Sequence, residues 1–94
     1  MHQPYYRDLL TGVSLMPWVR LHATKDYVDM VRLLDDFPAI HQTFNLVPSL
    51  IDQVQEYLPP ANRSDRLLDL CIKPADALTR EEQTILLQEG FMVN

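Results

Sequence analysis

Residues 39–44, with the sequence AIHQTF, decide the expected fold class of this chain. The stretch is short, contains β-branched and aromatic residues, and lies between two segments of helical periodicity, which is typical of a β-strand. Only helical patterns follow it. One clear strand among several helices predicts an α/β protein that is mostly helical over its 94 residues and whose sheet is incomplete.

A helix is expected before this strand, because apolar residues recur there at helical spacing. They are Tyr27, Met30, Val31, Leu34 and Phe37. Thr24 is expected to cap the helix at its N-terminus, and Pro38 to end it, since the residue before a proline is pushed out of helical geometry. Residues 1–17 keep no regular period and are predicted to form a loop.

Three helices are expected after the strand. Pro48 fits the first turn of one, which Pro59 and Pro60 end. Its apolar face comprises Leu50, Ile51, Val54, Tyr57 and Leu58. A short helix is predicted around residues 64–71. Another covers residues 80–89, because Thr79 and Glu82 can form a capping box and Gly90 is a natural C-terminal stop.

Composition and charge exclude several classes of function. The formal net charge is −5, and the eight Lys and Arg are scattered, which argues against nucleic acid and anionic membranes as partners. No apolar run approaches transmembrane length, and the N-terminus lacks the features of a signal peptide. With Cys71 as the only cysteine, no internal disulfide can form, so a cytoplasmic location is expected.

Cofactors and metals are not expected either. His2, His22, His41 and Cys71 have none of the short paired spacings of a zinc site. The chain has two glycines, too few and too far apart for a phosphate-binding loop.

Three ordered blocks are the most specific signals in the sequence: residues 2–6 (HQPYY), 16–23 (MPWVRLHA, leading into a Lys-Asp-Tyr at 25–27) and 41–50 (HQTFNLVPSL). Together they resemble glycoside hydrolase family 57, whose first conserved region is a His-Gln-Pro directly after the first barrel strand. The resemblance extends over essentially the whole chain.

The resemblance implies that residues 1–94 are the N-terminal part of a distorted (β/α)7 barrel that acts on α-glucans, in a family with α-amylase, 4-α-glucanotransferase and amylopullulanase activities. Its members retain anomeric configuration with a glutamate nucleophile and an aspartate general acid, both on later strands. Neither has a counterpart in this chain. The resemblance therefore implies no catalytic residue here, and a chain that is inactive alone although its parent family is enzymatic.

Chemistry gives the same expectation without the family. Retaining hydrolysis needs two carboxyl groups about 5 Å apart, one of them with a raised pKa. The acids of this chain fall mainly on polar faces or first turns of the predicted helices, where solvated surface charge is the usual role.

Four residues are candidates for substrate binding: His2, Gln3, Trp18 and Asn45. His2, with Gln3 beside it, would face the active-site mouth at the end of a barrel strand, where a neutral imidazole can bond a sugar hydroxyl; the alternative is a disordered terminal residue. Trp18, with two tyrosines at 5 and 6, either stacks under a sugar or packs beneath a loop. Asn45 either lies at the top face of the barrel or serves as a turn residue.

Arg20 and His22 either line the same cleft or pair with Asp26 to cap the helix. Two functions remain in competition. The first is a fragment of a glycoside hydrolase, with an α-glucan oligosaccharide as ligand in the full-length context and the rest of the barrel, or a second copy, as partner. The alternative is a small non-catalytic helical module that binds a protein through its exposed apolar faces. The sequence does not distinguish among glucans, or between hydrolysis and transglycosylation.

Overall fold

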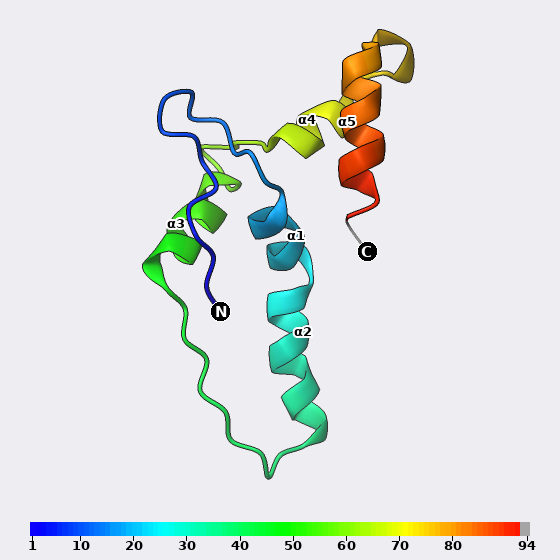
Figure 1. The fold of residues 1–94 in the computed structure, drawn as a ribbon. Coiled ribbons are helices and arrows are strands. Elements are labelled where there is room, and N and C mark those ends of the chain that lie inside the picture. Colours follow the sequence, from blue (N-terminus) through cyan, green and yellow to red (C-terminus); the bar gives the residue numbers. More distant parts are fainter. Residues whose placement is uncertain (93–94) are drawn as a thin grey trace. The chain divides into compact units, whose positions relative to one another are not determined.

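The computed structural model describes residues 1–92, which divide into two compact units (Figure 1). The first unit comprises Met1–Tyr6 and Trp18–Arg63. The second comprises Arg7–Pro17 and Ser64–Asn94. Each unit is built from short helices. None of the helices in the described part of the chain is long and apolar enough to cross a membrane.

The first unit contains three α-helices: α1 (Trp18–Thr24), α2 (Asp26–Arg32), which runs into the 3₁₀ turn η1 (Leu33–Asp36), and α3 (Pro48–Glu56). Helix α1 packs against both α2 and α3. The buried apolar side chains of this unit are Val19 on α1 and Leu50 on α3. The apolar side of α2 remains largely open to solvent, with Met30 41% and Val31 48% exposed.

The predicted role of Thr24 is wrong. Thr24 is the last residue of α1, and its hydroxyl donates a hydrogen bond of 2.8 Å to the carbonyl oxygen of Leu21 in the preceding turn. The predicted helix begins at Asp26, as α2, and it is preceded by α1, a helix that the sequence did not predict. Lys25 (φ −143°, ψ −62°) interrupts the helical path, and its carbonyl accepts the first bonds of α2 from Val28 and Asp29. Pro38 follows the end of η1, as predicted.

The predicted strand at residues 39–44 is not formed in the described residues. The chain leaves a turn in which the Ile40 amide bonds the carbonyl of Phe37, and then runs to α3 without regular structure (Figure 1). The physical reason is non-local, because strand propensity produces a strand only where a second strand satisfies its backbone groups.

One contact of the strand type does exist just beyond this stretch. The Met1 ammonium donates a hydrogen bond of 2.6 Å to the carbonyl oxygen of Asn45, and the Val47 amide lies 3.5 Å from the carbonyl oxygen of Met1. In a parallel strand pair, a residue bonds the two residues that flank the one opposite to it. Met1 thus lies opposite Leu46 in parallel register.

Helix α3 begins at Pro48 as predicted. Proline suits this position because the amide that it lacks would have had no partner within the helix. The helix ends at Glu56, so Tyr57 and Leu58 of the predicted apolar face lie beyond it.

The second unit contains the loop of residues 7–17, helices α4 (Arg66–Ile72) and α5 (Arg80–Gly90), which pack together, and the 3₁₀ turn η2 (Ala75–Ala77). Both predicted helices are confirmed. The Thr79–Glu82 capping box forms, and Lys73 contacts Glu82 at 2.9 Å. This contact, with a bond from the Thr79 amide, lowers the pKa of the Glu82 carboxyl.

The loop of residues 7–17 is tied to the start of α4 through isolated bridges from Ser14 to Arg7 and to Asp65. Asp65 is fully buried and caps α4 by accepting a 2.9 Å hydrogen bond from the Leu68 amide. Within the loop, Gly12 adopts φ 71°, a left-handed conformation that a glycine takes without strain.

Candidate functional site

The residues before the loop, 1–6, form an extended segment that we call the N-terminal strip. Its start is held by the bonds of Met1 to residues 45 and 47. Next along the strip, the hydroxyl of Ser49 donates a 2.8 Å hydrogen bond to the carbonyl oxygen of Gln3. The strip therefore runs from the end of the segment before α3 onto the first turn of that helix.

The far end of the strip is held by two further residues of α3. The side-chain amide of Gln53 bonds both the carbonyl oxygen of Pro4 and the amide of Tyr6, each at 2.9 Å. The hydroxyl of Tyr5 donates a 3.0 Å hydrogen bond to Asp52. Neither Gln53 nor Asp52 was singled out from the sequence as part of a site. A glutamine on an amphipathic helix gives no signal that separates it from an ordinary surface residue.

His2 differs from every other residue of the strip. It is exposed, and in the described part of the chain it has no hydrogen bond, ion pair or ring contact. The backbone on either side of it is fixed, by Met1 and by Gln3. His2 therefore carries an imidazole without a described partner, on a segment whose other residues all make hydrogen bonds.

Gln3 lies between two tyrosines. The Tyr6 hydroxyl donates a 2.7 Å hydrogen bond to its Oε1 atom, and its Nε2 atom donates to the Tyr27 hydroxyl at 3.0 Å. Burial, with the neighbouring Tyr27 phenol, raises the pKa of Tyr6, so this hydroxyl keeps its proton over the physiological range. One amide hydrogen and one lone pair of Gln3 remain for a ligand.

Trp18 and His22 form an aromatic cluster with the same tyrosine. The Trp18 and His22 rings are stacked with centroids 6.2 Å apart, and the His22 and Tyr27 rings lie 6.0 Å apart. Trp18 is half-buried, so its ring is only partly available to a sugar. Through Tyr27, the structure links Trp18 to Gln3 by a chain of direct contacts.

The structure decides one alternative for His22. Its Nδ1 atom lies 2.5 Å from the Asp26 carboxylate at (i, i+4) spacing, so the structure shows the pairing alternative, although no side chain caps α2 at Lys25. The hydrogen bond from His22, followed by that from Lys25, lowers the pKa of Asp26.

Asn45 is exposed, and its described contact is made by the backbone, whose carbonyl accepts the Met1 ammonium. This bond places Asn45 beside Met1, the first residue of the strip and the one that precedes His2. The four candidate residues are therefore all in the first unit.

Two carboxylates of the first unit converge on one cation. Asp26 and Asp29 lie 3.2 and 3.5 Å from the Nζ atom of Lys25. A general acid in retaining hydrolysis needs a raised pKa, whereas that of Asp26 is lowered. This pair is an ion-pair network on exposed helix ends and lacks the electrostatics of a glycosidase dyad.

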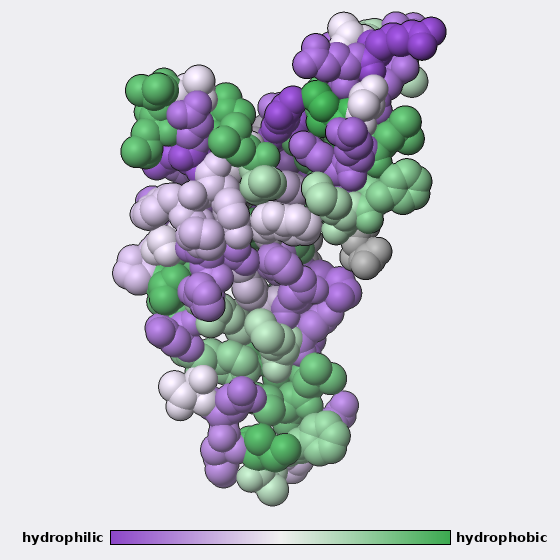
Figure 2. Space-filling view, viewed as in Figure 1, coloured by the Kyte–Doolittle hydropathy of each residue, from purple (hydrophilic) through white to green (hydrophobic). Residues whose placement is uncertain are grey.

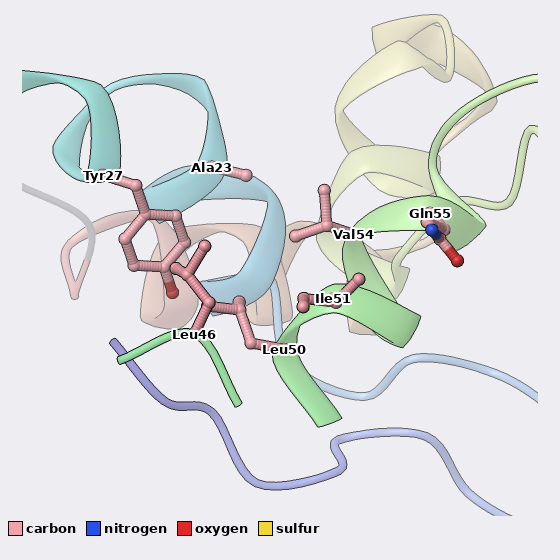
Figure 3. A pocket seen from close by; sticks show the side chains of 7 residues that line it. All are labelled: Ala23, Tyr27, Leu46, Leu50, Ile51, Val54 and Gln55. Atoms are coloured by element: carbon pink, nitrogen blue, oxygen red, sulfur yellow. The ribbon is translucent and has the colours of Figure 1, made fainter. Parts of the chain in front are cut away.

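An apolar groove of about 240 Å³ opens on the same unit (Figure 3). Its walls are Ala23 and Tyr27 on one side and side chains from α3 and the segment before it on the other. These latter residues are Leu46, Leu50, Ile51, Val54 and Gln55. In Figure 3 the Tyr27 ring is drawn beside Leu46, and Ile51, Val54 and Gln55 are drawn further along α3.

No group of three or more His, Cys, Asp or Glu side chains within residues 1–92 could hold a metal ion. Comparison with known proteins gives one finding: the model of glycosyl hydrolase family 57 matches residues 1–89. No curated protein and no solved structure matches the chain. The match extends over nearly all of the sequence, including the strip, the aromatic cluster and helix α3, and the chain therefore belongs to glycosyl hydrolase family 57.

Proposed function

We propose that this chain is the N-terminal part of a family 57 glycoside hydrolase acting on α-glucans, in which the N-terminal strip supplies one wall of the substrate cleft. The observation that carries the proposal is the isolation of His2, an exposed imidazole without a partner on a strip that is otherwise fixed at every residue. Because the backbone on either side of His2 is already fixed, binding a ligand through this side chain costs little backbone entropy.

The chemistry of the strip suits a neutral polyhydroxyl ligand. A neutral imidazole has one donor and one acceptor nitrogen, which matches a hydroxyl group. Gln3 adds one donor and one acceptor, and Trp18 adds part of an aromatic face. Asn45, which lies beside the start of the strip, would contribute its side-chain amide. These four residues are the substrate-binding set of the proposal, which contains no metal or cofactor.

The register of Met1 supports the barrel assignment. Met1 lies opposite Leu46 in the pattern of a parallel strand pair. In a barrel, residues 39–44 would be the strand that continues this pairing in the direction away from His2, which would place His2 and Asn45 together at its carboxyl end. Active sites lie at that end of such barrels.

We further propose that the chain alone does not cleave glucans and resides in the cytoplasm. The converging carboxylates Asp26 and Asp29 are neutralised by Lys25, and the pKa of Asp26 moves in the wrong direction for a general acid. Hydrolysis of maltohexaose by the 94-residue chain, lost on mutating one of its own acids, would contradict this.

The experiment that tests the proposal uses a complete barrel that contains this segment. His2→Ala should reduce kcat/KM without reducing the stability of the fold. Reading the DNA on both sides of the gene for an in-frame upstream strand and a downstream barrel tests the fragment assignment separately.

The groove favours a second candidate, a small non-catalytic helical module that binds a protein. Exposed apolar residues surround it in the first unit, including Ile51 at 43% and Leu46 at 54%. Figure 2 also shows apolar surface at the lower end of the view, where α2, η1 and the following turn lie. A complete reading frame of 94 codons with no adjoining barrel, and a chain that leaves maltohexaose unbound, would favour this function over the first.

A further inference from the structure

Gln53 is the buried polar residue of α3, with 3% of its surface exposed. Its Oε1 atom accepts a 2.9 Å hydrogen bond from the Tyr6 amide. Its Nε2 atom donates one hydrogen to the carbonyl oxygen of Pro4 and the other to that of Ser49, both at 2.9 Å. Every hydrogen of this amide is in use, and both protein segments that it joins belong to the first unit.

The geometry of these bonds is that of a β-strand neighbour. In a parallel pair, one peptide residue donates to the carbonyl of residue i and accepts from the amide of residue i+2. The Gln53 side chain does this to Pro4 and Tyr6. At the other end of the strip Met1 does the same to residues 45 and 47, because it donates to the carbonyl of Asn45 and accepts from the amide of Val47. The side-chain amide thus takes the place of a missing strand.

The effect of Gln53 continues beyond the backbone. Because it fixes the Tyr6 amide, it also fixes the point from which the Tyr6 side chain reaches back to Gln3. That hydroxyl donates to Oε1 of Gln3 and so leaves Nε2 to face Tyr27. The orientation of the Gln3 amide therefore depends on a residue fifty positions away in the sequence.

We propose that Gln53 is a positioning residue of the site, which holds the backbone of Pro4 and Tyr6 and, through Tyr6, orients the side-chain amide of Gln3. This inference rests on the function proposed for His2. An amide is required at this position, because a carboxylate could accept from Tyr6 but would set its lone pairs against the Pro4 carbonyl, and an apolar side chain could do neither.

The test compares three variants of the 94-residue chain by NMR. Gln53→Met keeps the length of the side chain and removes all of its bonds. Gln53→Glu keeps the acceptor for Tyr6 alone. Gln55→Met is the matched control, since Gln55 is exposed on the same helix and its side chain has no described hydrogen bond.

In Gln53→Met we expect the Tyr6 amide to exchange with solvent at least about tenfold faster than in the wild type. The order parameters of the Tyr5 and Tyr6 amides should fall from about 0.85 to below about 0.6, and the side-chain amide of Gln3 should become more mobile. Gln53→Glu should protect the Tyr6 amide better than Gln53→Met does. Gln55→Met should match the wild type in both measurements, and helix content by circular dichroism should be alike in all variants.

Unchanged Tyr6 exchange in Gln53→Met, or equal losses in Gln55→Met, would overturn the proposal. If Gln53→Met fails to fold, the wild type decides: two separate, slowly exchanging Nε2 hydrogens of Gln53 support the bonds, and rapidly exchanging ones refute them. Neither signal involves a sugar. A failure here is therefore distinguishable from a failure of His2 to affect catalysis.

Discussion

The Tyr6 hydroxyl donates a 2.7 Å hydrogen bond to Oε1 of Gln3, three residues before it in the sequence. This bond joins two side chains of the strip, and the backbone that carries them is held from outside by Ser49 and Gln53 of α3. The candidate site is therefore a product of tertiary structure. Its parts are close in sequence, yet the helix sets their orientation.

The variant Tyr6→Phe removes this bond while keeping the ring. We expect the first unit to lose about 1 kcal/mol of unfolding free energy, the usual contribution of a part-buried hydrogen bond. Urea unfolding followed by the fluorescence of Trp18, the one tryptophan, reports on this unit. Tyr5→Phe is the control, because Tyr5 is 55% exposed and its loss should stay within about 0.5 kcal/mol. Equal losses in the two variants would refute a special role for Tyr6.

The pairing of His22 with Asp26 predicts a pH dependence of stability. The bond from His22 lowers the pKa of Asp26 below its ordinary value of 3.8 in the folded state. A group with a lowered folded-state pKa stabilises the fold above its unfolded pKa, and that stabilisation is lost as the pH falls through the folded value. Asp26→Asn should therefore lessen the loss of stability on acidification below about pH 4.

This acid sensitivity is measured by urea unfolding at a series of pH values, again through Trp18, which stacks on His22. The control is Asp35→Asn, which alters an exposed carboxylate of η1. If acidification lowers the stability of Asp26→Asn as much as that of the wild type, the contribution of the His22–Asp26 pair is contradicted.

The capping box predicts that the second unit loses local stability when the start of α5 is altered. The Thr79 hydroxyl accepts a 3.2 Å hydrogen bond from the Glu82 amide at the start of α5. Thr79→Ala should cost about 1 kcal/mol in local stability. Hydrogen exchange at the first amides of α5 measures it. Thr84→Ala is the control, since Thr84 bonds the carbonyl of Arg80 within the same helix and alanine favours a helix interior. Exchange that responds equally to both changes would contradict the prediction.

The segment at residues 40–44, which has strand propensity but no regular structure, predicts self-association. No strand lies beside it in the described residues, and a second chain can supply the pairing that its backbone lacks. We expect a melting temperature that depends on protein concentration, and we expect Ile40→Lys to weaken that dependence, because a charge disfavours pairing at an edge. Leu58→Lys is the control, because Leu58 is 53% exposed, similar to Ile40 at 54%, but lies outside the segment. A sharp melting transition of a monomer, independent of concentration, would disprove association.

Sequence alone predicted the features that depend on local chemistry. Pro48 at the start of α3 and the Thr79–Glu82 box at the start of α5 were read correctly, because each signal lies within a few residues of the structure that it specifies. Thr24 failed, because a hydroxyl can bond backwards to Leu21 as readily as it caps forwards.

The prediction of a strand at residues 39–44 failed for a different reason, which also explains why no role was predicted for Gln53. A strand needs a partner strand, and a buried glutamine needs backbone groups to bond. Both partners come from distant parts of the chain, so the local sequence does not reveal them. Among the site candidates, the sequence selected His2 and Gln3 as part of a family motif. Only the structure distinguishes the unengaged imidazole of His2 from the amide of Gln3, which is held by Tyr6 and Tyr27.

The most direct test of the account is the His2→Ala variant in a complete barrel that contains this segment, measured for both catalysis and stability. Because His2 is exposed and has no described partner, its removal should leave the melting temperature unchanged. We expect kcat/KM on maltohexaose to fall roughly tenfold to a thousandfold, which corresponds to about 1.4 to 4 kcal/mol of transition-state stabilisation. A lower melting temperature with full activity per folded molecule would contradict it and remove His2 from the substrate site.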